Sequence, residues 1–416
     1  MKNFAFIETF YKYSPVDFDF LKDLVPESFG SYIDFLPIFL SAVLFALLAT
    51  PIIGYIAKKY KIMDYPCDER KIKLNKHDDP KRHCHTIPTP LLGGIAFILP
   101  AIIALLFFWD VSLEIRAVLL GVLILTIVGI LDDIFNLPAI YQFMGQLAAG
   151  IVVCFSPLSL ISINIPLDGT VYLNWLETSF SLWGIPLMLV FPGDLLMLLW
   201  ILICINAIKF VNGSDGLMEG NAIIICLLFF VLGIRTEAEI IIILSLILAG
   251  GITGFLFYNF PPAKIFSGSA GKTTLGFLIA VIAILNNTKF ATSIMILTLP
   301  MIDFFFVIAK RYLTIKPKGF FELIKINDTN HLHHQLLNLG FSPKRVLLME
   351  VSITLAIGLI AILTTGAMNL FFFFLMILMV IVIILTIHII VRSRQSAQNS
   401  EEEKKVKESP ESRYSY

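Results

Sequence analysis

The most constraining feature of this chain is the separation of its apolar and ionisable residues along the sequence. Of its 416 residues, 57% are hydrophobic and 15% are charged, which is more apolar side chain than a water-soluble domain can bury. Apolar stretches recur with lengths near the ~20 residues that cross a bilayer as a helix. They predict an all-α, polytopic membrane protein.

We expect about eleven transmembrane helices, several of them short enough to be tilted or re-entrant. The predicted spans are 35–57, 91–109, 115–131, 139–155, 195–209, 222–234, 238–258, 275–286, 290–309, 346–365 and 369–391. Together they form a transmembrane domain over 35–391. Residues 1–34 lack the pattern of a cleaved signal peptide and form an extracytoplasmic segment. The charged residues 392–416 predict a disordered cytoplasmic tail.

The loops alternate in their content of basic residues, and this alternation orients the chain. Residues 58–87 hold nine Lys and Arg and residues 310–345 hold seven, whereas residues 156–193 hold none. Basic residues near span ends are retained in the cytoplasm. The N-terminus is therefore predicted outside and the C-terminus in the cytoplasm of a multi-pass protein of the cell membrane. Zero formal net charge gives no support for nucleic-acid binding.

Two adjacent carboxylates, Asp132 and Asp133, end the third predicted span at the membrane boundary. Adjacent acids there need a positive partner. A Mg²⁺ ion that also holds substrate phosphates is one such partner. A solvated helix end is equally consistent with this pair.

The fifth predicted span ends in a polar turn that contains glycines. Glycine lets backbone amides approach a ligand closely, and carboxylate and amide side chains add oxygen ligands. The polar residues of this stretch are Asn206, Lys209, Asn212 and Asp215. Taken alone, they are also consistent with an ordinary polar turn.

Three of the seven histidines, His331, His333 and His334, lie between the ninth and tenth spans. Imidazole can bind a diphosphate, position a carboxylate or transfer a proton near neutral pH, and a zinc site is the rival interpretation of this motif. The His and Cys residues of 67–85 lack paired metal-site spacing, so we interpret them as loop residues. Residues 268–273 are similar to a phosphate-binding P-loop, but Phe266 stands where that motif requires glycine.

Taken together, these clusters resemble the polyprenyl-phosphate N-acetylhexosamine-1-phosphate transferases, the membrane family that includes phospho-MurNAc-pentapeptide translocase. Seven matching segments follow the family's order over about 64–346. They are Asp64-Tyr65-Pro66 with Glu69-Arg70-Lys71, Pro88-Thr89-Pro90-Leu91-Leu92-Gly93-Gly94, Leu131-Asp132-Asp133, Asn206-Ala207 with Asp215-Gly216-Leu217, Phe260-Pro261-Pro262-Ala263-Lys264-Ile265-Phe266, Pro300-Met301-Ile302-Asp303, and Asp328 with His331-Leu332-His333-His334. Each segment is weak alone, but their order is specific.

The resemblance implies transfer of a sugar 1-phosphate from a UDP-sugar to polyprenyl phosphate, with release of UMP, in cell-envelope polysaccharide synthesis. It implies as catalytic residues Asp132, Asp133, His331, His333 and His334. It implies as substrate-binding residues Asn206, Lys209, Asn212, Asp215, Lys264, Ser269 and Lys272. Asp132 and Asp215 would hold Mg²⁺ or Mn²⁺. The His-Leu-His-His form favours UDP-N-acetylglucosamine or a related sugar, and a homodimer is left open.

The chain departs from the family pattern at several charged positions. A usual metal-binding Asp is Ser269, a second Asn of the fifth-span motif is Lys209, an Asp three residues later is Asn212, and Lys272 has been added. In one interpretation the lysines partly replace the charge of the cation in an active enzyme, because lysine binds phosphate as a point charge.

Two other interpretations stay open. The chain could keep the fold without turnover and serve as a lipid-linked-sugar binder or as a subunit of an envelope complex, because losing a metal ligand costs orders of magnitude in rate. A secondary transporter is the third hypothesis, although the acids gather at one face rather than at mid-span.

Overall fold

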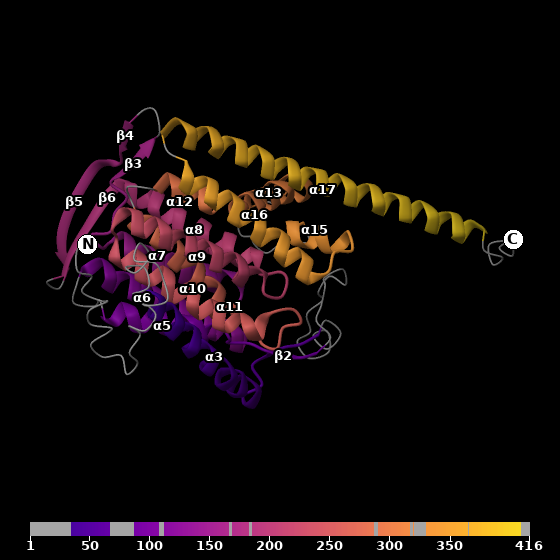
Figure 1. The fold of residues 1–416 in the computed structure, drawn as a ribbon, viewed down its shortest axis with the longest axis horizontal. Helices are drawn as coiled ribbons and strands as arrows, with labels where there is room; N and C mark the ends of the chain where they lie inside the picture. Colours follow the sequence, from indigo (N-terminus) through magenta and orange to yellow (C-terminus); the bar gives the residue numbers. More distant parts are fainter. Residues whose placement is uncertain are drawn as a thin grey trace, which may run out of the picture.

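The computed structural model describes residues 35–66, 87–107, 112–165, 169–182, 185–286, 290–316, 319, 330–364 and 366–408. The predicted N-terminal segment and the His and Cys residues of 67–85 lie outside this part of the chain. Most of the described chain is a bundle of helices that lie side by side (Figure 1). The helices are α3 (Leu36–Lys59), α5 (Ile95–Phe107), α6 (Leu113–Phe135), α7 (Ala139–Cys154), α8 (Gly193–Val211), α9 (Leu217–Thr236), α10 (Glu239–Asn259), α11 (Gly268–Leu285), α12 (Phe290–Ile296), α13 (Thr298–Ile315), α15 (Leu332–Asn338), α16 (Pro343–Leu363) and α17 (Gly366–Glu408).

Among the described residues, eight helices are long and apolar enough to cross a membrane. The helices α12 and α13, bent by 69° at their junction, make a ninth span if they are taken together. The helices α5 and α7 are apolar but shorter, with 13 and 16 residues. Each predicted apolar span coincides with one of these helices or with the bent pair. The multi-span helical fold is therefore confirmed, whereas eleven crossings and their orientation stay predictions.

The connection between α7 and α8 departs from the all-α prediction because it contains two β-hairpins. Strand β3 (Ser162–Ile165) pairs antiparallel with β4 (Gly169–Tyr172), and β5 (Asn174–Leu182) pairs antiparallel with β6 (Ile185–Pro192). Residues 155–192 contain four Ile and six aromatic residues, which suit strands, and they have no apolar run of span length. The hairpins cover the end of the bundle opposite α15 (Figure 1). A third short pair joins β1 (Met63–Asp64) to β2 (Thr89–Pro90).

The last helix extends further than the sequence predicts. Helix α17 continues to Glu408, so residues 392–408 are helical where we expect a disordered tail. This segment is rich in Gln, Glu, Lys and Arg, which are good helix formers. Local propensity therefore extends the helix beyond the bundle (Figure 1).

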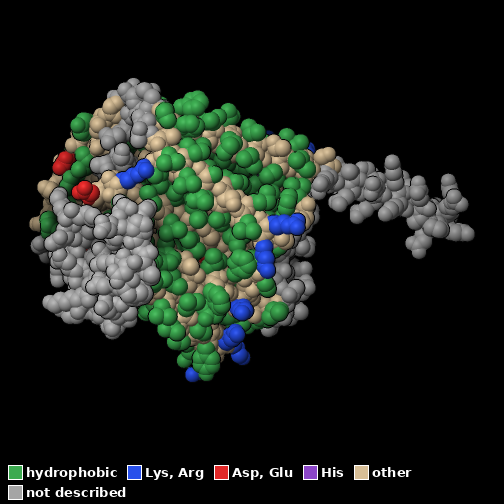
Figure 2. All heavy atoms as spheres, viewed as in Figure 1, with side chains coloured by type: hydrophobic (Ala, Val, Ile, Leu, Met, Phe, Trp, Pro, Cys, Tyr) green, Lys and Arg blue, Asp and Glu red, His purple; other side chains and the backbone are tan. Residues whose placement is uncertain are grey.

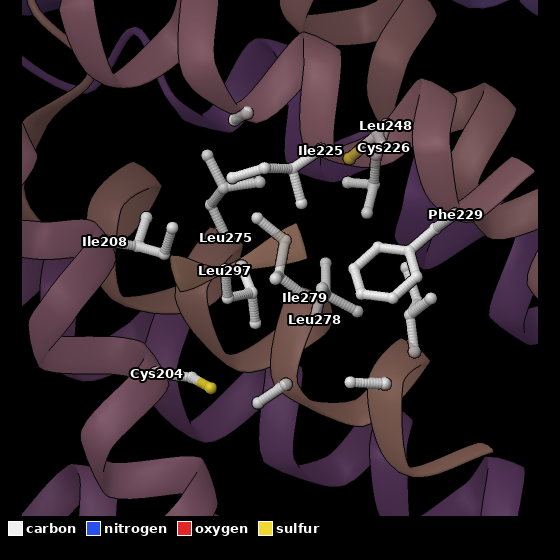
Figure 3. Close-up of a cluster of buried hydrophobic side chains, with 14 of the residues drawn as sticks. Cys204, Ile208, Ile225, Cys226, Phe229, Leu248, Leu275, Leu278, Ile279 and Leu297 are labelled. Carbon is white, nitrogen blue, oxygen red and sulfur yellow. The ribbon is translucent and has the colours of Figure 1, made fainter. Parts of the chain in front are cut away.

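The centre of the bundle is α11, which packs against α6 and α8. Within the most apolar 18 residues of α11, 89% of the residues are buried inside the bundle, whereas the share is 17% for the corresponding stretch of α17. Figure 3 shows Leu275, Leu278 and Ile279 of α11 facing Ile225 and Phe229 of α9. Figure 2 shows apolar side chains over the visible flank of the bundle, with most visible Lys and Arg toward the end that holds α15 and β2. An apolar flank beside a basic end fits a membrane-spanning bundle.

Glycines bring the first turn of α11 close to its neighbours. A Cβ on Gly129 of α6 would lie 2.3 Å from Ala270 Cα, and a Cβ on Gly94, just before α5, would lie 2.2 Å from Gly271 Cα. Any larger residue must push the backbones apart, as at other small-residue helix contacts in membranes. These glycines therefore fix the position of residues 268–272 beside the end of α6.

The variant Gly129→Ala tests this approach. The added methyl group must separate α6 from α11, and we expect overpacking to cost about 1–3 kcal/mol of stability. The measurement is the apparent melting temperature of the purified protein in detergent. The control is Gly54→Ala in α3, where a Cβ would meet Ile265 Cδ1 at an ordinary 3.4 Å. Equal melting temperatures for the two variants would contradict the assigned role of Gly129.

Candidate active site

The adjacent acids Asp132 and Asp133 lie in the last turn of α6, against the first turn of α11. The backbone N–H of Ser269 donates to Asp133 Oδ1 over 2.7 Å, and the Ser269 hydroxyl donates to Asp132 Oδ2. Gly268, at φ +70°, permits this approach because a Cβ there would lie 2.3 Å from Asp133 Oδ2. Ser269 therefore binds both acids, and the positive end of the α11 dipole lies at Asp133.

Lys209 of α8 reaches the same acids through a side chain of α7. Lys209 Nζ donates to Gln142 Oε1 over 2.5 Å, and Gln142 Nε2 donates to Asp132 Oδ1 over 2.9 Å. About one turn earlier on α8, Asn206 Nδ2 donates to Gln146 Oε1 over 2.8 Å. The two glutamines are four residues apart and so share one face of α7. They join α7 to α8 in a polar seam that ends at the acid pair.

Lys272, about one turn after Ser269 on α11, adds a second positive charge. Its charge lies close enough to interact with those of Asp133 and Lys209. It also interacts with Glu219, a fully buried acid in the first turn of α9. Two lysines and three acids, contributed by α6, α8, α9 and α11, therefore form one charged cluster.

Asp215 belongs to a neighbouring turn rather than to the acid pair. Its Oδ2 accepts the N–H of Ala263 over 2.9 Å, which joins the turn after α8 to the loop after α10. Lys264 in that loop is exposed. Asn212 directly follows α8 as its C-cap residue. The turn of Asp215 lies near the charged cluster, because the charge of Asp215 interacts with that of Glu219.

The three predicted histidines are buried beside one another in and just before α15. The rings of His331 and His333 are parallel within 6°, with centroids 5.7 Å apart, and the centroids of His333 and His334 are 4.3 Å apart. Asp303 of α13 holds this group: its Oδ2 lies 2.7 Å from His331 Nδ1, and its Oδ1 accepts the N–H of Leu332 over 2.8 Å. The bonds to Asp303 fix the ring plane of His331.

The end of α8 connects the histidines to the charged cluster. The Phe210 ring lies 5.2 Å from the His331 ring, and a Cβ on Gly213 would lie 1.9 Å from His333 Nε2. Since Lys209 directly precedes Phe210, the last turn of α8 has the lysine and acids on one side and the histidines on the other. Every predicted site residue therefore lies at the same end of the bundle, around α8.

The structure adds residues to this site that the sequence analysis does not select. They are Gln142, Gln146 and Glu219, together with Asp303, which the sequence indicates only as part of a family motif. In the sequence, the signal for the polar seam on α7 is a pair of glutamines four residues apart within an apolar segment. The sequence does not indicate Glu219 as a site residue, because the predicted sixth span begins at residue 222 whereas α9 begins at Leu217.

The fold and the site define a multi-pass membrane protein with acids, lysines and histidines gathered at one end. Residues 115–287, from α6 to just past α11, match the family described as Glycosyl transferase family 4. This matched segment contains the acid pair, both lysines and Glu219.

Relatives extend the similarity over most of the chain. A Bacillus subtilis protein named "Probable undecaprenyl-phosphate N-acetylglucosaminyl 1-phosphate transferase" is 30% identical, over 77% of this chain and 81% of the relative. A "Decaprenyl-phosphate N-acetylglucosaminephosphotransferase" of Mycobacterium leprae is 28% identical, over 77% and 81%. A "Phospho-N-acetylmuramoyl-pentapeptide-transferase" of Latilactobacillus sakei is 28% identical, over 65% and 82%. The chain belongs to glycosyl transferase family 4 and is a multi-pass membrane protein.

Members of this family generally depend on Mg²⁺. Within the described ranges, no three His, Cys, Asp or Glu side chains are grouped so that they could hold a metal ion. Both oxygens of Asp132 accept hydrogen bonds from the chain, and Asp215, the other predicted ligand, is bonded to a different loop. The donor set does not fit a divalent ion shared by Asp132 and Asp215.

The variant Asp303→Asn tests how the histidines are held. The amide cannot accept both from the His331 ring and from the Leu332 N–H with the strength of a carboxylate, and we expect about a 10–100-fold loss of turnover, as for other partners that orient a functional histidine. The measurement is product release per folded protein in detergent. The matched control is Asp194→Asn, a buried acid at the opposite end of the bundle that accepts the Val190 N–H over 2.6 Å. Equal losses of turnover in both variants would contradict a local role for Asp303.

Proposed function

We propose that this chain transfers an N-acetylhexosamine 1-phosphate from a UDP-sugar to polyprenyl phosphate, giving polyprenyl-diphosphate sugar and UMP. The observation that carries the proposal is the cluster in which Lys209 and Lys272 lie beside Asp132 and Asp133, joined through α8 to the histidines. It lies at the end of the bundle that the sequence predicts to face the cytoplasm. The names of the relatives describe transfers of the same class.

The reaction forms one P–O bond and breaks another. An oxygen of the lipid phosphate attacks the phosphorus that carries the sugar, and the bond from that phosphorus to the bridging oxygen of UMP breaks. Both substrates are anions, so their approach requires positive charge that is already in place. Lys209 and Lys272 supply this charge and bind the diphosphate. Lys264, exposed on the neighbouring loop, is a further phosphate contact.

The other site residues position the two substrates. Asp132 and Asp133, fixed by Ser269, orient the lipid phosphate and accept any proton that it carries. The histidines bind the diphosphate or the sugar as hydrogen-bond donors. Asn206, Asn212 and Asp215 bind on the side of the nucleotide. The product would enter cell-envelope polysaccharide synthesis, and UDP-N-acetylglucosamine is the sugar donor that we propose.

A binding role without turnover is the second candidate, because Ser269 engages both acids and so limits their freedom to act on a substrate. The continuous connection from the acid pair through Lys209 to the histidines favours the enzyme. A site that only binds a ligand does not need acids, lysines and imidazoles fixed in position relative to one another.

The experiment follows UMP release by the purified protein from UDP-N-acetylglucosamine and undecaprenyl phosphate. We expect release by the parent chain and about a 10²–10³-fold loss in Asp133→Asn, because the carboxylate that α11 and Ser269 hold in place is lost. The control Glu177→Gln changes an exposed acid on β5 and should keep the parent rate. No release by the parent chain, with release by Ser269→Asp, would establish the binding role instead.

A further inference from the structure

The charged cluster contains, within the chain itself, the positive charge that a diphosphate site requires. Lys209 is joined to Asp132 through Gln142, and Lys272 lies about one turn after Ser269, which binds both acids. The charges of the two lysines interact with those of the acids before any substrate binds. We propose that this lysine pair takes the place of a divalent cation, so that the chain binds and transfers its diphosphate substrate without Mg²⁺. This inference rests on the proposed function, which it deepens.

The chain itself already binds three of the four carboxylate oxygens of the acid pair, and only Asp133 Oδ2 is buried with no hydrogen-bond partner. Asp132 Oδ1 accepts from Gln142 and Oδ2 accepts from the Ser269 hydroxyl, while Asp133 Oδ1 accepts the Ser269 N–H. A divalent ion held by both acids would have to displace a donor from Asp132 and lie close to two ammonium groups, whereas an ion at Asp133 Oδ2 alone would have a single carboxylate ligand. Like charges in a poorly solvated site repel strongly. The lysines and a cation therefore compete for the same position beside the acids. The lysines occupy it in the free protein because they are part of the chain.

The ammonium group of Lys209 is held so that it can also bind a ligand. Its bond to Gln142 Oε1 is 2.5 Å long, and Gln142 is itself fixed because its amide donates to Asp132 and to the Leu137 carbonyl, over 2.9 and 3.2 Å. A lysine has three donor hydrogens. One bond to Gln142 leaves two hydrogens for phosphate oxygens, at a place that two fixed bonds define.

A buried acid, Glu219, lies near enough to Lys272 for their opposite charges to attract, although no hydrogen bond joins the two side chains. Glu219 is fully buried in the first turn of α9, and its charge interacts with that of Lys272. A buried carboxylate is costly without a compensating charge, so each of the two groups stabilises the other. We assign Glu219 as a positioning residue that keeps the Lys272 ammonium beside Asp133. It acts on the substrate only through Lys272.

The first test measures cation binding separately from turnover, with Mn²⁺ alone as the probe and electron paramagnetic resonance as the readout. The parent chain without substrate should show no saturable Mn²⁺ site. The double variant Ser269→Asp, Lys209→Asn, which adds a carboxylate and removes an ammonium group, should gain one. Saturable binding of one Mn²⁺ by the parent chain that is lost in Asp132→Asn would overturn the proposal.

The second test measures UMP release in EDTA and in Mg²⁺. The parent rates should agree within about twofold, whereas Lys209→Met should lose about 10²–10³-fold, as when one charge-stabilising donor is removed from an active site. Release that stops in EDTA and returns with Mg²⁺ would overturn the lysine assignment and leave the proposed transfer intact. No release under any condition would count against the transfer itself, and the Mn²⁺ measurement would still decide the cation question.

The role of Glu219 has its own readout. Glu219→Gln should raise the KM for UDP-N-acetylglucosamine more than it lowers kcat, and Glu219→Asp should restore part of the loss because it keeps the charge. A lower melting temperature in Glu219→Gln with an unchanged KM would show that Glu219 is structural only.

Discussion

The site depends on one contact, the approach of the first turn of α11 to the last turn of α6. Gly129 and Gly268 leave room for it, and Ser269 completes it by donating to Asp133 from its backbone and to Asp132 from its hydroxyl. Two adjacent acids at a membrane boundary are stable only where donors or cations face them. The helix N-terminus provides the first donors, and the lysines of α8 and α11 provide the charge.

The last turn of α8 then organises the rest of the site. Lys209 faces the acid pair through Gln142, while Phe210 on the next position faces His331. Consecutive residues of a helix point about 100° apart, so one turn can contact two clusters on opposite sides. The separate motifs of the sequence become one site because a single helix end lies between them.

Much of the fold is readable from the sequence, because a membrane span needs a long apolar run and such a run is a local property. The apolar spans coincide with helices for this reason. The hairpins after α7 and the helix of residues 392–408 could not be read in this way, since strand pairing depends on a distant partner and the charged helix carries no apolar run. For the site, the sequence indicates Asp132, Lys209 and His331, but it does not show which of them share a partner.

What the sequence by itself determined is the class of protein and the set of charged residues at one end of its spans, because residue types and spacing are local. Only the tertiary structure decided which charges meet. Ser269 and Gln142 bind Asp132, the charge of Glu219 interacts with that of Lys272, and Asp303 holds His331. These contacts join residues far apart in the chain, and they form because helices packed through glycine bring their polar ends close enough for hydrogen bonds and opposite charges to compensate one another.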